Sequence, residues 1–205
     1  MMQPTERYRV QRTGSSAPLA ILAIILAGVL FAGACGRQDT QSGAESHQDA
    51  TTSGTNLLPQ EALVGLDVVQ NYFPEIEQQT ATSENSTASG TPDATRMVIY
   101  EGGDGRRVTV SGDQYPSADA AASAFEQAIG NSETVQGFVP LPAPADVGDK
   151  AFAGSVTQGA DTHIGYGALA GEYVIGVTSA GYPATTENVE KLAGLTRDAV
   201  EKATA

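Results

Sequence analysis

Few side chains of this chain have the type and spacing that chemistry needs. Cys35 is its only cysteine, and it follows an uncharged apolar run, Ala17 to Ala34, that ends in three small residues. Small residues let a signal peptidase hold the backbone extended, and a thiol at the next position is a nucleophile that can be acylated. A basic stretch with Arg7, Arg9 and Arg12 precedes the run. We therefore predict that residues 1–34 are an export signal and that Cys35 carries a lipid.

The segment Phe31-Ala32-Gly33-Ala34-Cys35 resembles the lipobox of bacterial lipoprotein precursors, although Ala32 stands where that family prefers Leu. The resemblance implies cleavage before Cys35 and attachment to the extracytoplasmic face of a cell membrane or outer membrane. Several acyl chains on one cysteine hold a protein stably without further membrane contact. Two alternatives remain, an uncleaved spanning helix and a free or intermolecular thiol.

Two pairs of side chains have the types of metal ligands. Glu101 and Asp104 flank two glycines, and carboxylates beside flexible backbone can bind a hard cation. This run lacks the further ligands of an EF-hand loop, so we interpret it as a hairpin turn. Asp161 and His163 would share one face of a strand, but no third histidine or free cysteine completes a zinc site. We expect neither a metal nor another cofactor.

Catalytic residues are equally hard to assign. A serine nucleophile needs a base, and His163 is the only histidine of the folded part, because His47 falls in a polar segment. Neither a Gly-x-Ser-x-Gly elbow nor a phosphate-binding glycine loop with its lysine occurs. A carboxylate dyad remains an alternative, because the chain has 24 acidic residues and sequence spacing does not show proximity. Five tyrosines either line an apolar pocket or pack with their hydroxyls at its rim: Tyr100, Tyr115, Tyr166, Tyr173 and Tyr182.

Hydrophobic periodicity predicts the elements that would position these residues. We expect a first helix from Pro59 to about Val69, and then a polar loop over 80–93. Two hairpins should follow, 97–111 about the glycine-rich turn and 163–178 about Gly171, with a strand over 148–156 between them. Helices capped by Ser117 and by Thr185 or Thr186 should come after the hairpins. The run Val139 to Asp146 has three prolines, which is unsuited to a central strand.

The order of these elements predicts an α+β fold, a mainly antiparallel sheet with helices on one face. A constant offset aligns Val110 with Val177 and the pair Tyr115-Pro116 with Tyr182-Pro183. The alignment suggests two ββα repeats, although any two units of this kind share strand and helix periodicities.

Composition divides the chain into the signal 1–34, a lipidated and disordered tether 35–56, and one domain 57–205. The tether has almost no apolar residue and a reach of about 25 Å. The formal charge of −13 is a poor match for nucleic acid or anionic lipid. With Cys35 acylated, the domain has no disulfide.

The strand entry Val147-Gly148-Asp149-Lys150-Ala151, its hairpin and the last helix resemble extracytoplasmic sensor and lipoprotein domains of high-GC bacteria, including those of some membrane Ser/Thr kinases. Those domains usually have paired cysteines, which this chain lacks. We expect a non-enzymatic binding or interaction module with an unidentified protein or small-molecule partner. The alternatives are a carboxylate hydrolase, with or without a metal, and a structural envelope protein.

Overall fold

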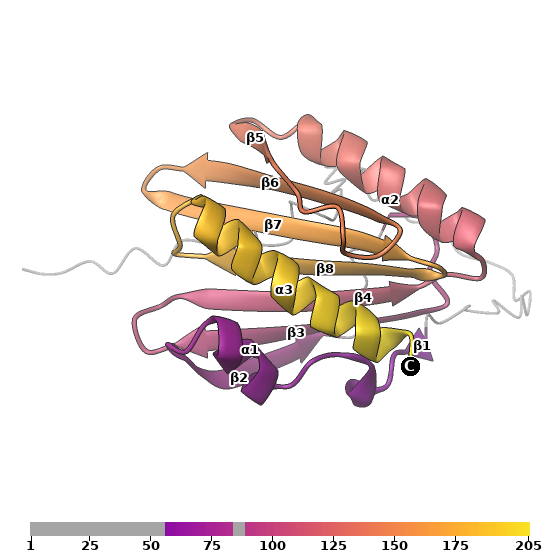
Figure 1. Ribbon diagram of the computed structural model, residues 1–205, viewed down its shortest axis with the longest axis horizontal. Helices are drawn as coiled ribbons and strands as arrows, with labels where there is room; N and C mark the ends of the chain where they lie inside the picture. Colours follow the sequence, from indigo (N-terminus) through magenta and orange to yellow (C-terminus); the bar gives the residue numbers. More distant parts are fainter. Residues whose placement is uncertain (1–55, 84–88) are drawn as a thin grey trace, which may run out of the picture.

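An eight-stranded sheet forms the centre of the structure, a computed structural model that describes residues 56–83 and 89–205 (Figure 1). The strands are β1 (Asn56–Leu57), β2 (Ile76–Ser83), β3 (Ala94–Gly102), β4 (Arg107–Gln114), β5 (Phe138–Leu141), β6 (Lys150–Gln158), β7 (Asp161–Ala170) and β8 (Tyr173–Ala180). The helices are η1 (Gln60–Ala62, a 3-10 turn), α1 (Leu66–Tyr72), α2 (Ala118–Glu133) and α3 (Thr186–Ala203). Cys35, the predicted signal 1–34 and the predicted tether as far as residue 55 lie outside the described residues.

The strands follow the order β1-β3-β4-β8-β7-β6-β5, and β2 pairs with β3. Every pair is antiparallel except β1 with β3. The α+β class with a mainly antiparallel sheet is therefore confirmed, as are the two predicted hairpins, β3–β4 and β7–β8. Their second strands, β4 and β8, pair at the centre of the sheet, where Val110 lies opposite Val177.

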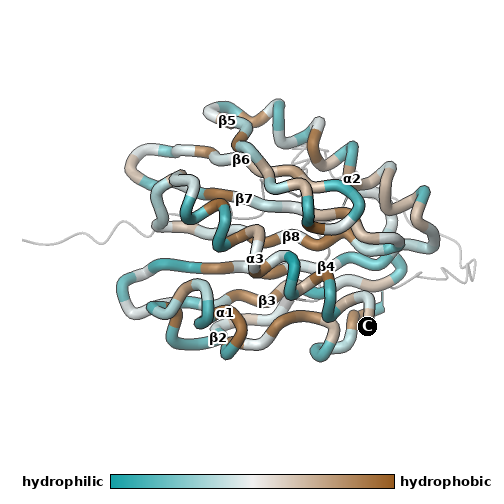
Figure 2. The backbone as a smooth tube through the Cα atoms, in the orientation of Figure 1, coloured by the Kyte–Doolittle hydropathy of each residue, from teal (hydrophilic) through white to brown (hydrophobic). Residues whose placement is uncertain are grey.

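One face of the sheet supports the larger core. Strand residues that alternate with polar or small neighbours point to this face, and most of them are fully buried: Val108, Val110, Ile164, Tyr166, Ile175 and Val177. Helix α3 lies across them with Leu192 and Leu195, and α1 adds Val69. In Figure 2 hydrophobic and hydrophilic stretches alternate along α3, as expected for a helix with one side on a sheet.

Helix α2 lies on the other face, which differs from the expected single helical layer. Its Ala121, Ala124 and Phe125 pack with Leu169 and Val174, whose strand neighbours Ala168 and Ile175 belong to the first face. Side chains alternate across a strand, so the two packing clusters lie on opposite sides of the sheet. At this end of β7, Ala168 is buried on the first face of the sheet and Leu169 on the second. Leu169 therefore belongs to the apolar surface that α2 covers.

This placement also bears on the suggested ββα repeat. The offset that aligns the two hairpins places Val110 on Val177, and these residues are partners in the β4–β8 ladder. A rotation that superposes the two hairpins maps each face of the sheet onto itself. Two repeated ββα units would therefore have both helices on the same face. Tyr115 instead packs in the α2 cluster and Tyr182 in the α3 cluster. We attribute the echo to shared periodicity.

Two segments differ from the sequence prediction in their local structure. The predicted first helix is split into η1 and α1, because Gly65 is extended, with φ −85° and ψ 174°, and caps α1. The first part of the predicted polar loop is the edge strand β2, whose residues 77–82 are all exposed. After Ile76, this edge strand therefore lacks the apolar alternation by which sequence analysis recognises strands.

No helix within residues 56–83 and 89–205 is long and apolar enough to span a bilayer. The buried residues of both clusters lie between Leu63 and Ala199. The domain therefore has its own core within the described residues.

Candidate functional site

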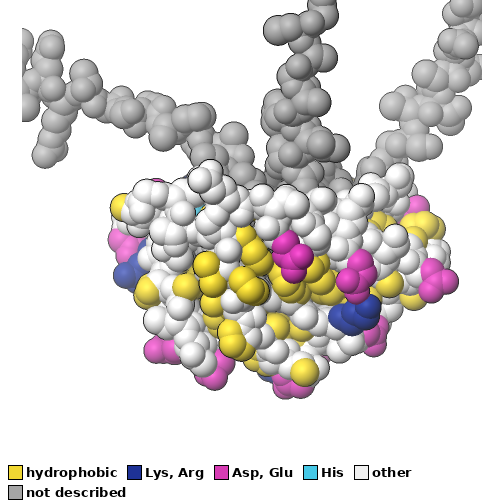
Figure 3. Space-filling view, turned by 90° about the horizontal axis from the view of Figure 1, so that it is seen from above, with side chains coloured by type: hydrophobic (Ala, Val, Ile, Leu, Met, Phe, Trp, Pro, Cys, Tyr) yellow, Lys and Arg dark blue, Asp and Glu magenta, His cyan; other side chains and the backbone are white. Residues whose placement is uncertain are grey.

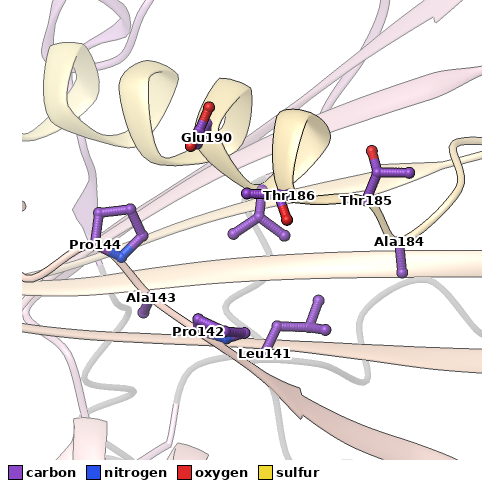
Figure 4. Close-up of a pocket in the computed structure, with 9 residues that line it drawn as sticks. Leu141, Pro142, Ala143, Pro144, Ala184, Thr185, Thr186 and Glu190 are labelled. Atoms are coloured by element: carbon purple, nitrogen blue, oxygen red, sulfur yellow. The ribbon is translucent and has the colours of Figure 1, made fainter.

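A groove opens between the first turns of α3 and the segment that leaves β5 (Figure 4). Its volume is about 340 Å³. One wall is the proline-rich segment Leu141 to Pro144, and the other consists of Ala184, Thr185, Thr186, Val189 and Glu190. Leucine, valine, alanine and proline side chains form most of the lining, so the groove is suited to an apolar group.

The proline-rich wall is fixed to the sheet from below. The Tyr166 hydroxyl donates to the Pro144 carbonyl at 2.7 Å, and Val147 is fully buried in the core. Leu141 and Ala143 pack against the same core. The Arg197 guanidinium, on α3, lies 2.7 Å from the Asp146 carboxylate and joins the two walls beyond the groove.

The helical wall is fixed at its cap. Thr185 is the N-cap of α3, and its hydroxyl accepts a hydrogen bond from the Asn188 N–H at 3.3 Å. The Asn188 side-chain amide donates to the Pro183 carbonyl at 2.9 Å, which fixes the turn before the helix. The prediction of a cap at Thr185 or Thr186 is confirmed for Thr185.

Tyr182 anchors the loop that enters this wall. Its ring packs edge-on against Phe73, and the Arg106 guanidinium lies 5.2 Å from its centroid. Arg106 is also 3.3 Å from the Glu75 carboxylate and 3.1 Å from that of Asp104. The loop before the groove is thus tied to the β3–β4 turn and to the segment after α1.

Charge at the groove is negative. Glu187, in the first turn of α3, is 2.8 Å from Lys191, and the hydrogen bond from that ammonium lowers the pKa of Glu187. Glu190, which lines the groove, forms no ion pair with any residue of the described ranges. No lysine, arginine or histidine lines the groove.

The apolar character continues to the edge of the sheet. Val139 of β5, which precedes the groove wall, is 53% exposed. Figure 3 views the molecule from above and shows hydrophobic side chains gathered in the middle, with acidic and a few basic groups around them. Pro140 within β5 lacks the N–H that a further strand would need, which protects the edge from strand addition.

A second cavity of about 350 Å³ lies between η1 and the β2 edge, lined by Glu61, Val98, Tyr100 and Lys202 among others. Its lining is more polar and has charges of both signs. It therefore offers no apolar group a comparable environment.

The turn residues that resemble cation ligands are engaged by arginines instead. Glu101 is 2.7 Å from Arg107, and Asp104 contacts Arg106 and accepts its backbone N–H at 3.1 Å. The interpretation as a hairpin turn is confirmed, since β3 and β4 pair up to Glu101 and Arg107.

Asp161 and His163 lie at alternate positions of β7, as expected for one face. Burial lowers the pKa of His163, and the Asp161 carboxylate opposes that shift. Within the described ranges no group of three metal-ligating side chains lies together.

The tyrosines do not line one pocket. Tyr100 donates to the Val64 carbonyl at 2.6 Å and Tyr115 to that of Ser89 at 2.7 Å, on opposite faces of the sheet. Burial raises the pKa of Tyr100 to about 12. These hydroxyls fix loops to the sheet, as the Tyr166 hydroxyl does.

Comparison with known proteins gives a likeness of fold. No family model and no curated protein matches the chain. The crystal structure of the extracellular domain of PknH from Mycobacterium tuberculosis is similar, with a TM-score of 0.54 and 16% identity over 73% of this chain and 100% of that one. A GTP binding regulator from Thermotoga maritima gives a TM-score of only 0.37, at 12% identity over 68% of this chain and 92% of that one. This score is too low to indicate a shared fold. The likeness to an extracytoplasmic domain that we expected from the second half of the sequence is thus supported at the level of fold.

Sequence analysis did not identify the groove. The proline-rich run was recognised as unsuited to a central strand, but its sequence does not show that α3 lies beside it. The only sequence signal for the groove was the proline-rich run. Prolines lack backbone donors and present an apolar surface, and a neighbouring helix need not cover that surface.

Proposed function

We propose that this chain is an extracytoplasmic lipoprotein, anchored by a lipid on Cys35, whose domain binds an apolar ligand in the groove between α3 and the Leu141–Pro144 segment. The observation that carries the proposal is the groove itself. Two independently fixed walls hold it open, and its lining is mainly aliphatic.

The sequence supports a lipid anchor on Cys35, and the fold supports an extracytoplasmic location. The run that ends in Ala32-Gly33-Ala34-Cys35 has the features of an export signal with a lipidation site. An extracellular domain shares the fold, and fold likeness alone does not transfer function. The sequence before Asn56 is almost without apolar residues from Gly36 on, which suits a tether between membrane and domain.

A binding role without turnover fits the groove better than hydrolysis does. Its lining has one carboxylate, Glu190, and no histidine, lysine or cysteine that would act as a base or nucleophile. The carboxylates of the β3–β4 turn, Glu101 and Asp104, are neutralised by arginines. The hydrolase alternative has no specific observation in its favour.

Ligand binding can be tested on residues 35–205 with Cys35→Ser, a form that has every described residue; circular dichroism and a melting curve establish that it is folded. Titration with 1-hexanol, followed by amide chemical shifts, should saturate and should shift Ala184, Thr186 and Val189. Ala184→Phe, which fills the groove from an exposed position, should abolish these shifts, whereas Ala160→Phe in the exposed β6–β7 turn should leave them unchanged. Non-saturating shifts, or shifts confined to other elements, would refute the proposed site.

The anchor has a separate test. Mass spectrometry of the protein isolated from membranes should find an acylated Cys35 as its first residue, and Cys35→Ala should release the protein from the membrane fraction. An unmodified thiol or an intact residue 1 would contradict this part of the proposal.

A further inference from the structure

We infer that the groove selects aliphatic cations, such as alkylammonium groups, over anionic or neutral aliphatic molecules of the same length. The inference rests on the proposed function, because it specifies the ligand class of the same groove. It depends on which charges are present at the groove and on which of them are already neutralised.

The lining determines the apolar half of the ligand. Leu141, Pro142, Ala143 and Pro144 line one side of the groove and Ala184 and Val189 the other, and no aromatic ring is among the lining residues. A ligand with an aromatic ring would find no partner for stacking, whereas an alkyl chain gains binding free energy from each methylene that is buried. The lining therefore favours a flexible aliphatic chain.

Glu190 determines the polar half. It lies one turn after Thr186 on α3, at the groove, and its carboxylate is free of ion pairs with the described lysines and arginines. The nearby basic groups are engaged elsewhere, Lys191 with Glu187 at 2.8 Å and Arg197 with Asp146 at 2.7 Å. A ligand ammonium would thus meet one unpaired negative charge and no competing cation.

The N-terminus of α3 is the one feature that would favour an anion. Its effect is already offset, since the Thr185 hydroxyl accepts the Asn188 N–H and Glu187 places a carboxylate in the first turn. The net charge of −13 adds a field that attracts cations and repels anions. The balance at the groove is therefore negative.

The size of the selectivity follows from exposure. Glu190 is an exposed residue, and ion pairs in such positions contribute about 1 kcal/mol or less, which corresponds to a factor of about five in Kd. Each methylene that becomes fully buried should tighten binding by up to about fourfold, or 0.8 kcal/mol. The length of the alkyl chain should determine how tightly a ligand binds, and the charge of its head group should determine which of two ligands of equal length is preferred.

The test compares n-hexylammonium, 1-hexanol and n-hexyl sulfate on residues 35–205 with Cys35→Ser, at low and at high salt. The ammonium should bind about threefold to fivefold tighter than the alcohol, the sulfate should bind more weakly than both, and the differences should shrink with salt. A series from butyl to octylammonium should tighten with length until the groove is filled.

Glu190→Gln should reduce the affinity for the ammonium to that for the alcohol and leave the alcohol unaffected. Glu201→Gln is the matched control, because it removes the same charge from α3 three turns away, at about 16 Å along the axis. Equal binding of ammonium and alcohol, or an equal effect of both variants, would overturn the inference and leave the proposed groove intact. Failure of all three ligands to bind would refute the proposed function itself.

Discussion

The ring of Tyr182 packs edge-on against the ring of Phe73, with centroids 5.0 Å apart and an interplanar angle of 66°. Phe73 is the C-cap of α1, and Tyr182 lies in the loop that leads into α3, so the contact joins two distant parts of the chain. Both residues belong to the larger core.

Truncation of this contact should be costly. Phe73 is fully buried, and Phe73→Ala should lower the free energy of unfolding by about 3–5 kcal/mol, because it removes the ring and leaves a cavity. Tyr182→Phe keeps the ring and should cost about 1 kcal/mol or less. Denaturant unfolding measures both values. Similar losses for the two variants would mean that the Tyr182 hydroxyl contributes as much to stability as the Phe73 ring, contrary to this prediction.

Alkaline pH should weaken the support of the proline-rich wall. Burial raises the pKa of Tyr166 to about 12, and the Asp146 carboxylate adds to the shift. The unfolded tyrosine ionises near pH 10 and the folded one only near 12, so its contribution is complete below pH 10 and is lost as pH rises between these values.

Tyr166→Phe tests this linkage. It should cost about 1 kcal/mol at neutral pH, because the bond to the Pro144 carbonyl is lost, and its stability should fall less steeply than that of the parent between pH 10 and 12. Unfolding by urea at each pH gives both curves. Parallel curves would show that the Tyr166 hydroxyl is not protected in the folded state.

The ion pair between Asp146 and Arg197 should contribute less than that hydrogen bond. Their side chains are 71% and 40% exposed, and exposed pairs are screened by solvent and salt. Asp146→Asn should therefore lower the free energy of unfolding by less than about 0.5 kcal/mol in moderate salt. A loss greater than that of Tyr166→Phe would reverse this ranking of the two tethers.

The hairpins and the caps could be predicted from sequence because their signals are local. Alternating valines and a glycine-rich turn specify β3 and β4, and Ser117 caps α2 by accepting the Ala120 N–H at 3.2 Å. Helix α2 continues through Gly130 and Asn131 to Glu133. A single glycine costs a helix only about 1 kcal/mol relative to alanine, so Gly130 does not end α2.

The side of the sheet to which each helix packs could not be predicted. Both hairpins lead through a Tyr-Pro pair into a helix, and in each case the helical stripe would fit either face. Tertiary contacts decided the outcome, because Leu169 and Val174 cover one end of the second face and α2 packs on them. The groove depends on the same kind of contact, between α3 and a proline run about forty residues earlier in the chain.

Gly148 should be the least replaceable residue of the segment that joins the proline-rich wall to β6. It has φ +67°, a left-handed conformation, and a Cβ at this position would lie 2.4 Å from the Leu169 carbonyl oxygen. That oxygen already accepts the Asp149 N–H at 2.7 Å and belongs to a central strand pair, so it cannot move away easily. The position therefore combines backbone strain with a collision.

Gly159 provides a matched control for a Gly148→Ala variant. It has φ +64°, but no heavy atom lies within 4 Å of its would-be Cβ. Gly159→Ala should cost about 1 kcal/mol from the left-handed conformation alone, whereas Gly148→Ala should cost at least about 2 kcal/mol more, because strand β7 or the wall must shift. Gly148→Ala should also weaken 1-hexanol binding, since Val147 and the segment before it carry the groove wall, while Gly159→Ala should not. Equal losses of stability would show that the chain at Gly148 shifts easily to make room for the new methyl group. The groove wall would then be less rigid than we infer from its hydrogen bond and its buried contacts.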